Sequence, residues 1–161
     1  IRPNLAAKKD IIQNAIDLVS ALTNTTPKVA ILSAVETVEE KIPSTLDATA
    51  LCKMAERGQI TGGLLDGPLA MDNAISSEAA KSKGILSQVA GDADILVAPD
   101  LESGNMLFKQ MRCLSGIEGA GIVLGARAPI ILTSRAGGPA TRKASCAMAL
   151  VFQRKREGQT R

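Results

Sequence analysis

The sequence contains no histidine, no tryptophan and no tyrosine, and it has two phenylalanines. The absence of histidine excludes zinc sites with histidine ligands, histidine general bases and triads of serine, histidine and aspartate. A sequence-reading RNA-binding protein would need aromatic side chains on which bases stack. The net charge of +3 is too small to indicate a DNA-binding face. We therefore expect no nucleic-acid partner.

Cysteines and long apolar runs are scarce as well. Cys52, Cys113 and Cys146 are odd in number and widely spaced, and we interpret them as buried thiols of a cytoplasmic protein. No apolar run reaches the roughly 18 residues that a membrane-spanning helix needs, and no signal peptide is visible. The sequence thus predicts a cytoplasmic protein without a membrane partner. The chain begins with Ile1 rather than Met, as expected of a piece of a longer protein.

What is present is an alternation of helical and strand patterns. With 161 residues, 45% of them hydrophobic, the chain can bury one core, and we expect a single α/β domain over residues 1–161. The apolar spacing predicts, in chain order, helix 5–22, strand 28–34, helix 44–58 with a cap at Ser44, strand 60–66, helix 73–84, strand 94–99, helix 104–115, strands 120–126 and 129–134, and helix 139–156. Such an order favours a mostly parallel sheet covered by helices on both faces. The short link between the last two strands predicts one antiparallel pair.

Ligands of such sheets bind beyond the carboxyl ends of the strands. Four predicted strands are followed by unusually polar segments, namely "VETVEEKIPS", "DGPLAMDN", "PDLESGN" and "SRAGGPATR". We interpret them as the walls of one cleft. Within the second, "DGP" suggests a sharp turn at a strand end, where Asp66 either caps locally or faces the cleft.

The segment "ILTSRAGGPATR" (131–142) joins an apolar strand to a helix. Gly137 and Gly138 allow backbone N–H groups to point inward, and Pro139 suits the first helical turn. With Arg135 beside it, such a helix start is suited to an anion. The alternative is a plain strand–turn–helix corner with a solvated arginine.

The segment "PDLESGNMLFKQMR" (99–112) also has two interpretations. Asp100 and Glu102 may serve as helix caps, with Lys109 and Arg112 on the wet face of the helix. Alternatively, the segment forms the cleft wall opposite Ser134 and Arg135. By contrast, the glycines of "GAGIVLG" (119–125) precede a strand instead of opening a helix, so we reject a dinucleotide fingerprint there.

Five segments, among them "ITGGLLDGPLAMDNAIS", "VAPDLESGNMLFKQ" and "GIVLGARAPIILTSR", resemble in sequence and order the phosphate acetyltransferase/phosphate butyryltransferase family over about residues 5–150. The resemblance implies reversible transfer of a short acyl group between coenzyme A and inorganic phosphate. It also implies a two-domain α/β protein similar to the isocitrate and isopropylmalate dehydrogenases. The chain matches the later part of that family, so an amino-terminal domain is expected to lie outside it.

The family's site residues carry over one by one. The resemblance assigns catalytic roles to Ser134 and Arg135, and substrate-binding positions to Asn105 and Lys109. Arg112 matches a second active-site arginine when counted back from Ser134, but is one residue short when counted from Asn105. We add three further residues of the two segments to the expected substrate-binding set: Asp100, Gly137 and Gly138.

Two positions depart from the family pattern. Thr141 stands where acetyl-type members carry a carboxylate, and Gly137-Gly138 stand where butyryl-type members commonly carry Asp-Ser. The identity of the general base therefore stays open. The expected ligands are acyl-CoA, phosphate and acyl phosphate, with no metal or redox cofactor, and we expect a homodimer. The alternatives are a non-catalytic CoA-binding or acyl-phosphate-binding domain and a dehydrogenase of the related fold.

Overall fold

A three-stranded parallel sheet forms the centre of the computed structural model, which describes residues 1–135 and 137–159. Its strands are β1 (Lys28–Leu32), β2 (Leu64–Leu69) and β3 (Ile95–Val97), in the order β2-β1-β3. The middle strand pairs in parallel with both neighbours. The chain therefore passes over β1 between β2 and β3, and all three strands end at the same edge of the sheet.

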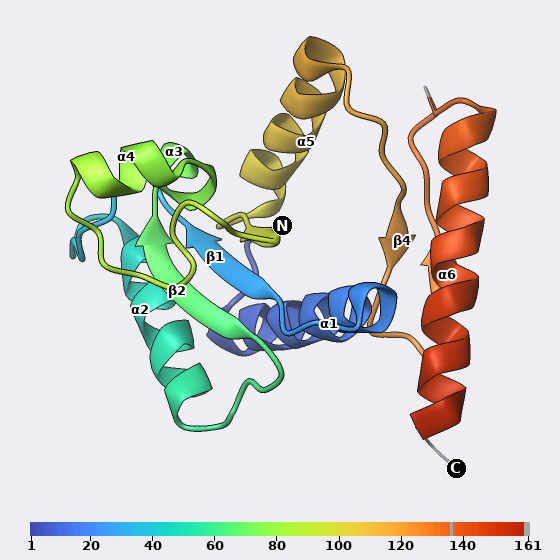
Figure 1. Cartoon of the computed structure of the whole chain (residues 1–161), viewed down its shortest axis with the longest axis horizontal. Coiled ribbons are helices and arrows are strands. Elements are labelled where there is room, and N and C mark those ends of the chain that lie inside the picture. Colours follow the sequence, from blue (N-terminus) through green and yellow to red (C-terminus); the bar gives the residue numbers. More distant parts are fainter. Residues whose placement is uncertain (136, 160–161) are drawn as a thin grey trace.

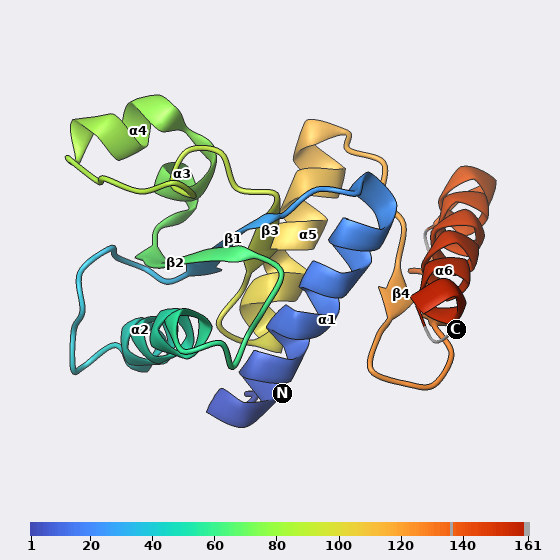
Figure 2. The ribbon, with the colours of Figure 1, turned by 60° about the horizontal axis from the view of Figure 1, so that its bottom comes forward.

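Alternate residues of β1 pack into two different cores. Val29 and Ile31 join a cluster with residues of α1 (Leu5–Thr23) and α2 (Pro43–Glu56) on one face. Ala30 and Leu32 join a second cluster with Ala74 of α3 (Met71–Ile75) on the other face. Figures 1 and 2 show α1 and α2 on one side of the sheet and α3 on the opposite side. The predicted parallel sheet with helices on both faces is thus confirmed, and burial on both faces explains the unbroken apolar run of this strand.

The sequence predicted one continuous helix over 73–84, and this prediction is wrong. The segment forms α3 and a separate α4 (Ser77–Ser82), with Ser76 in an extended conformation between them. Ser76 Oγ accepts a hydrogen bond from Ala79 N at 3.2 Å and so caps α4. Serine side chains compete with the helix for backbone donors, which explains the break.

The predicted strand 60–66 lies too early in the chain. A turn occupies 61–63, where Gly62 has φ +81°, and "DGP" is part of β2 instead of a turn that ends it. A Cβ at Gly67 would lie 2.8 Å from the Ile31 carbonyl oxygen, so this glycine allows β2 to approach β1 closely. Asp66 Oδ1 accepts a hydrogen bond from Gly67 N at 2.8 Å, which is the local role considered for it.

Ser44 is not the cap of α2, which begins at Pro43. Proline suits this first position because its missing N–H would have no partner there. Ser44 Oγ is instead hydrogen-bonded to Ser33 Oγ at 2.8 Å, and the next residue, Thr45, is fully buried. Thr45 Oγ1 accepts from Glu39 N at 2.9 Å, which ties the preceding loop to the helix.

The remaining elements are α5 (Leu101–Ser115), β4 (Ile122–Val123), β5 (Ile130–Ile131) and α6 (Pro139–Gln159). The two short strands pair antiparallel, as predicted, but they form a two-stranded ribbon separate from the central sheet. They are two residues long each, where the sequence predicted seven and six. In Figure 1 the ribbon lies against α6, away from the central sheet.

The glycines of "GAGIVLG" (119–125), which we did not interpret as a dinucleotide fingerprint, have packing roles. A Cβ at Gly119 would lie 3.1 Å from the Phe108 ring, and one at Gly121 would lie 2.4 Å from the Leu132 carbonyl oxygen. Gly125 has φ +92°, a conformation that favours glycine. These residues allow two segments to approach one another and do not open a helix.

The cysteines differ from the prediction of three buried thiols. Cys52 is half-buried, whereas Cys113 and Cys146 are exposed on α5 and α6. Burial, and then the negative charges of Asp66 and Glu56, raise the pKa of the Cys52 thiol to about 12. Cys52 is therefore a protonated, unreactive thiol at neutral pH. Among the described residues, no helix is long and apolar enough to cross a membrane.

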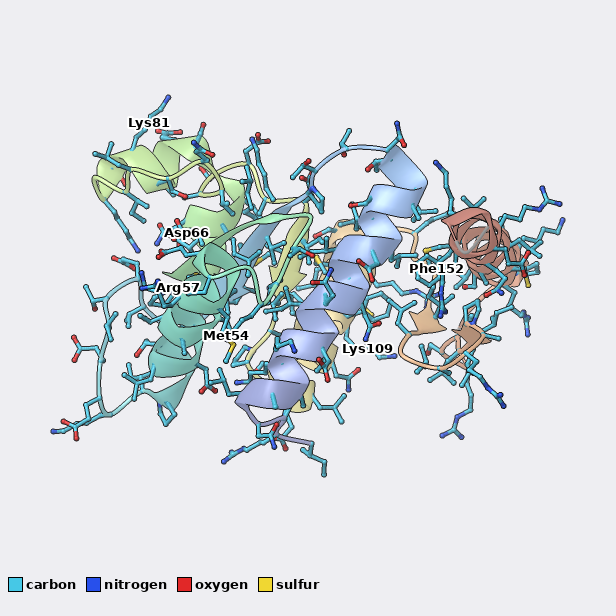
Figure 3. The ribbon with its side chains drawn as sticks, turned by 90° about the horizontal axis from the view of Figure 1, so that it is seen from below. Met54, Arg57, Asp66, Lys81, Lys109 and Phe152 are labelled. Atoms are coloured by element: carbon cyan, nitrogen blue, oxygen red, sulfur yellow. The ribbon has the colours of Figure 1, made fainter. Side chains whose placement is uncertain are left out.

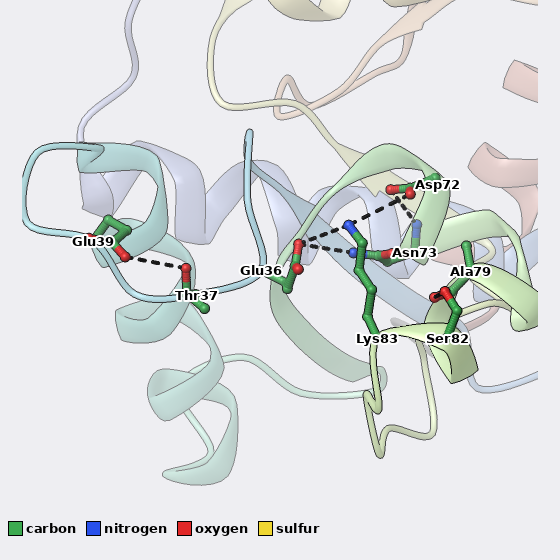
Figure 4. A network of polar contacts seen from close by, with 8 residues as sticks. All are labelled: Glu36, Thr37, Glu39, Asp72, Asn73, Ala79, Ser82 and Lys83. Carbon is green, nitrogen blue, oxygen red and sulfur yellow. Dashed lines mark hydrogen bonds and ion pairs between the residues drawn. The ribbon is translucent and has the colours of Figure 1, made fainter.

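A polar network joins the segments that follow β1 and β2 (Figure 4). Lys83 Nζ lies 3.2 Å from Glu36 Oε2 and 3.7 Å from Asp72 Oδ2, and Asn73 Nδ2 donates to Glu36 Oε2 at 3.2 Å. Asn73 itself is fully buried. A hydrogen bond from the backbone of Glu36, and then one from the side chain of Lys83, lower the pKa of the Glu36 carboxyl. The network fixes the loop after β1 against α3 and α4.

We expect the folded protein to depend on ionised Glu36. A lowered pKa in the folded state stabilises the fold above the pKa of the unfolded chain, and this stabilisation is lost as the pH falls through the folded value. Urea midpoints should therefore decrease more steeply for the native protein than for Glu36→Gln between about pH 5 and pH 3. Lys83→Met should flatten the pH dependence in the same sense. Parallel pH profiles for all three proteins would contradict this role.

Candidate active site

One hydrogen bond joins two of the segments that the sequence singled out. Lys109 Nζ, on α5, donates to Ser134 Oγ, which follows β5, at 3.3 Å. The two residues are 25 positions apart in the chain. Figure 3 labels Lys109, whose contact with Ser134 places this side of α5 toward the loop that follows the ribbon. The structure thus brings together a predicted catalytic residue and a predicted substrate-binding residue.

Three predicted residues of α5 share one helical face. Asn105, Lys109 and Arg112 are spaced by four and three residues, so their side chains project from the same side of the helix. Asn105 and Lys109 are exposed, and Arg112 is half-buried near the carboxyl end of the helix. Lys109, in the middle of this stripe, contacts Ser134 in the segment that follows β5. An amide, an ammonium and a guanidinium are thereby presented along one edge.

A backbone hydrogen bond joins Gly137 to Ser134. Gly137 N donates to the Ser134 carbonyl oxygen at 2.8 Å, and a Cβ at Gly137 would lie 2.9 Å from that oxygen. This N–H group is therefore engaged inside the turn, in contrast to the inward-pointing donor that the sequence predicted. Gly138 has no neighbouring atom that a Cβ would meet. Gly137 is thus required by close packing, whereas Gly138 is not.

Arg135 is the other predicted catalytic residue of this segment. Its side chain is exposed, next in the chain to the half-buried Ser134. Together with Lys109 and Arg112, it gives the two joined segments three cationic side chains. Such an edge is suited to an anion with several oxygens, since arginine binds phosphate with two parallel hydrogen bonds.

Asp100 is the N-cap of α5. Its Oδ1 accepts hydrogen bonds from Ser103 N and Ser103 Oγ, both at 2.8 Å. The hydrogen bond from the Ser103 backbone, and then that from its hydroxyl, lower the pKa of the Asp100 carboxyl. Lys109 lies nine positions after Asp100, which corresponds to a rise of about 14 Å along the helix. The structure therefore does not bring Asp100 to the Lys109–Ser134 contact, and capping accounts for its position.

The segments after β1 and β2 meet elsewhere. They join each other through the Glu36–Lys83 network, not through Lys109 or Ser134. The four predicted cleft segments thus form two separate polar groups. Within the described residues, no group of three or more Cys, Asp or Glu side chains is arranged to hold a metal ion.

A cavity of about 650 Å³ lies between α1 and α6, lined in part by Asp17, Phe152, Lys155 and Arg156. Arg156 stacks over the Phe152 ring at 5.7 Å and donates to the Ala126 carbonyl oxygen at 3.3 Å. The predicted site residues are not among its lining residues in the described part of the chain. The cavity and the predicted site residues therefore lie in different places. We assign the candidate site to the predicted residues, because their side chains can take part in the chemistry.

The sequence analysis did not single out the buried hydroxyl of Ser145. Ser145 lies on the packed face of α6, one helical turn before the buried Ala149, and its side chain is fully buried. The available signal was a serine at an apolar position of an amphipathic helix. Such a serine needs hydrogen-bond partners, because an unpaired buried hydroxyl costs free energy.

The chain is similar to known acyltransferases along nearly all its length. The profile of the family described as Phosphate acetyl/butaryl transferase matches residues 1–149. Phosphate acetyltransferase of Rhizobium meliloti is 64% identical over 156 residues, which are 97% of this chain and 49% of the relative. Phosphate butyryltransferase of Clostridium acetobutylicum is 46% identical over 147 residues, which are 91% of this chain and 49% of the relative.

The fold is also found among solved structures. A branched-chain phosphotransacylase from Enterococcus faecalis V583 superimposes with a TM-score of 0.84 at 32% identity, over 95% of this chain and 55% of that chain. The chain spans about half the length of the curated relatives it matches. These matches confirm the resemblance inferred from "PDLESGN" and "LTSR": the chain belongs to the phosphate acetyltransferase/phosphate butyryltransferase family.

Proposed function

We propose that the full-length protein catalyses reversible transfer of a short acyl group, acetyl or butyryl, between coenzyme A and inorganic phosphate. The observation that carries this proposal is the Lys109–Ser134 hydrogen bond, which joins two family-matching segments into one cationic edge. Membership of a family of phosphate acyltransferases supports the reaction class. We further propose that the reaction takes place in the cytoplasm.

The chemistry requires stabilisation of negative charge at two places. In the direction of acyl-CoA synthesis, the sulfur of CoA attacks the carbonyl carbon of the acyl phosphate, the bond from that carbon to the phosphate oxygen breaks, and phosphate leaves with the bonding electron pair. Negative charge develops on the carbonyl oxygen and on the leaving phosphate. Preorganised donors at such positions supply much of the catalysis in acyl transfer.

The residues of the site fit these two requirements. We assign Arg135 and Arg112 to the phosphate oxygens, and Ser134 to the developing oxyanion, to which it donates its hydroxyl hydrogen. Because Ser134 Oγ accepts a hydrogen bond from a charged ammonium, it becomes a stronger donor through hydrogen-bond cooperativity. Lys109 therefore strengthens and orients Ser134.

The missing carboxylate does not prevent the reaction. A free thiol of ordinary pKa near 8.5 is a few per cent thiolate at neutral pH, and nearby cations increase that fraction. With Thr141 and Gly137 at these positions, solvent or the departing phosphate takes the thiol proton, and the cationic side chains stabilise the thiolate.

We further propose that this chain forms one part of a two-domain enzyme related in fold to the isocitrate and isopropylmalate dehydrogenases. The described site is an open edge, and the facing wall is supplied by the remainder of the longer protein. Support comes from relatives that are about twice as long. Residues 1–161 by themselves should therefore turn over little substrate.

A non-catalytic CoA-binding protein is the second candidate. It is favoured by Thr141 and Gly137, which stand where the family resemblance implies a carboxylate in acetyl-type and butyryl-type members respectively. Calorimetric binding of CoA to the full-length protein, without release of free thiol from acetyl-CoA or butyryl-CoA in the presence of phosphate, would establish this alternative.

The Lys109–Ser134 contact generates the first kinetic prediction. In the full-length protein, Ser134→Ala should lower kcat on the order of a hundredfold, since one oxyanion donor is removed. Lys109→Met should have a comparable effect, and the double variant should be little worse than either single one, because both act through the same hydroxyl. Lys143→Met, an exposed lysine of α6, is the matched control and should keep its activity. Losses that add fully in the double variant would show that the two residues act independently.

The second kinetic prediction concerns Arg135. Arg135→Ala should lower turnover on the order of a hundred- to thousandfold, with little change in the urea midpoint, because the side chain is exposed. Arg135→Lys should recover little, since lysine lacks the forked geometry of the guanidinium. Arg142→Ala, an exposed arginine in the first turns of α6, is the control. Normal acyl phosphate synthesis by Arg135→Ala would move the phosphate site elsewhere.

We propose that the full-length protein is a homodimer. The outer side of α6 exposes two large apolar side chains, Leu150 and Val151, 62% and 43% of whose surfaces are accessible. Light scattering of the full-length protein at micromolar concentration should give the mass of two chains, and Leu150→Asp should shift that mass toward one chain. A clean monomer for the native protein would contradict the proposal.

A further inference from the structure

Ser145 is the buried anchor of the first turns of α6. Of residues 139–148, all of which the structure describes, it is the one that is buried, with no accessible surface. Its Oγ accepts a hydrogen bond from Gly121 N at 2.9 Å and donates one to the Thr141 carbonyl oxygen at 2.8 Å. One hydroxyl thus joins the helix to the residue that precedes β4.

The first route from Ser145 to Ser134 passes through the ribbon. The Gly121 carbonyl oxygen accepts from Leu132 N at 3.3 Å, and a Cβ at Gly121 would lie 2.4 Å from the Leu132 carbonyl oxygen. Gly121 is therefore held between Ser145 on one side and Leu132 on the other. Leu132 lies two residues before Ser134, so this contact fixes the backbone that leads into the site.

The second route passes through the start of α6. Arg142 N belongs to the same peptide group as the Thr141 carbonyl oxygen, and it donates to the Gly138 carbonyl oxygen at 3.3 Å, next in the chain to Gly137. Gly137 N in turn donates to the Ser134 carbonyl oxygen at 2.8 Å. This route reaches Ser134 from its carboxyl side.

The two routes close a ring of contacts that begins and ends at Ser145 and contains Ser134. We infer that Ser145 is a positioning residue for the reaction, a role that rests on the proposed function. By fixing the backbone on both sides of Ser134, it keeps the hydroxyl of that residue within hydrogen-bond distance of Lys109 Nζ. Small displacements of an oriented group cost catalysis steeply, so a residue without substrate contact can control kcat.

A serine suits position 145 better than an alanine does, because its hydroxyl forms two hydrogen bonds. Its oxygen accepts from a buried backbone N–H and donates to a helix carbonyl at the same time. With alanine, Gly121 N would lose its acceptor, and the ribbon would lose its tie to α6. The helix itself would persist, because alanine is a strong helix former.

The test compares Ser145→Ala with Ala149→Gly in the full-length protein. Ala149 is buried one turn further along the same helix, and glycine there weakens α6 without a link to Gly121. At a temperature where both variants are folded by urea titration, Ser145→Ala should lower kcat about tenfold to a hundredfold, with the KM for acyl-CoA nearly unchanged. Ala149→Gly should keep its kcat. Hydrogen exchange of a peptide covering 119–123 should accelerate in Ser145→Ala and not in the control.

Equal kcat values in the two variants, or unchanged exchange at 119–123, would overturn the inference. If Ser145→Ala does not fold, Ser145→Cys keeps the volume and weakens the hydrogen bond from Gly121, and full kcat in that variant would likewise overturn it. Failure of the proposed function would give a different result, since the native full-length protein itself would then release no free thiol from acetyl-CoA or butyryl-CoA in the presence of phosphate.

Discussion

The burial of β1 on both faces is the constraint on which the α/β body depends. Its last four residues are at most 7% exposed, and each is assigned to one of two cores by the alternation of the strand. A shift of one residue would exchange the two sets and place Val29 and Ile31 against the wrong helices. The position of β1 therefore fixes both neighbouring strands, and with them the edge at which the loops and α5 begin.

Much of this body could be predicted because its signals are local. The apolar run at 28–34 and the helical spacing at 5–22 each agree with the observed elements within one or two residues. Errors arose where a tertiary contact overrides a local preference. Gly67-Pro68 reads as a turn, yet the close approach of Gly67 to Ile31 makes it part of a strand. Ser76 interrupts a pattern that is otherwise helical.

The residues of the candidate site were proposed from the sequence, whereas the contacts between them could not be. A family resemblance can assign Ser134 and Lys109, but no spacing rule shows that they meet across 25 residues. Asp100 illustrates the opposite case, since its place before a helix already offered capping as an explanation. The glycines at 137 and 138 look alike in sequence, yet one donates its N–H inside the turn and the other is unconstrained by neighbours. The Gly137 N–H is thus occupied by the Ser134 carbonyl oxygen, so the proposed phosphate contacts are assigned to side chains.

The uneven burial of the three cysteines has a practical consequence. Cys52 is protonated and half-buried, whereas Cys113 follows Arg112 on α5 and Cys146 follows Ser145 on α6, and both are exposed. Maleimide probes will react with the two exposed thiols ahead of the third. The unaltered chain therefore carries a pair of attachment points for fluorophores or spin labels, one on each helix beside the site. Changes in the separation of α5 and α6 when substrates bind can be followed spectroscopically without introducing a single substitution.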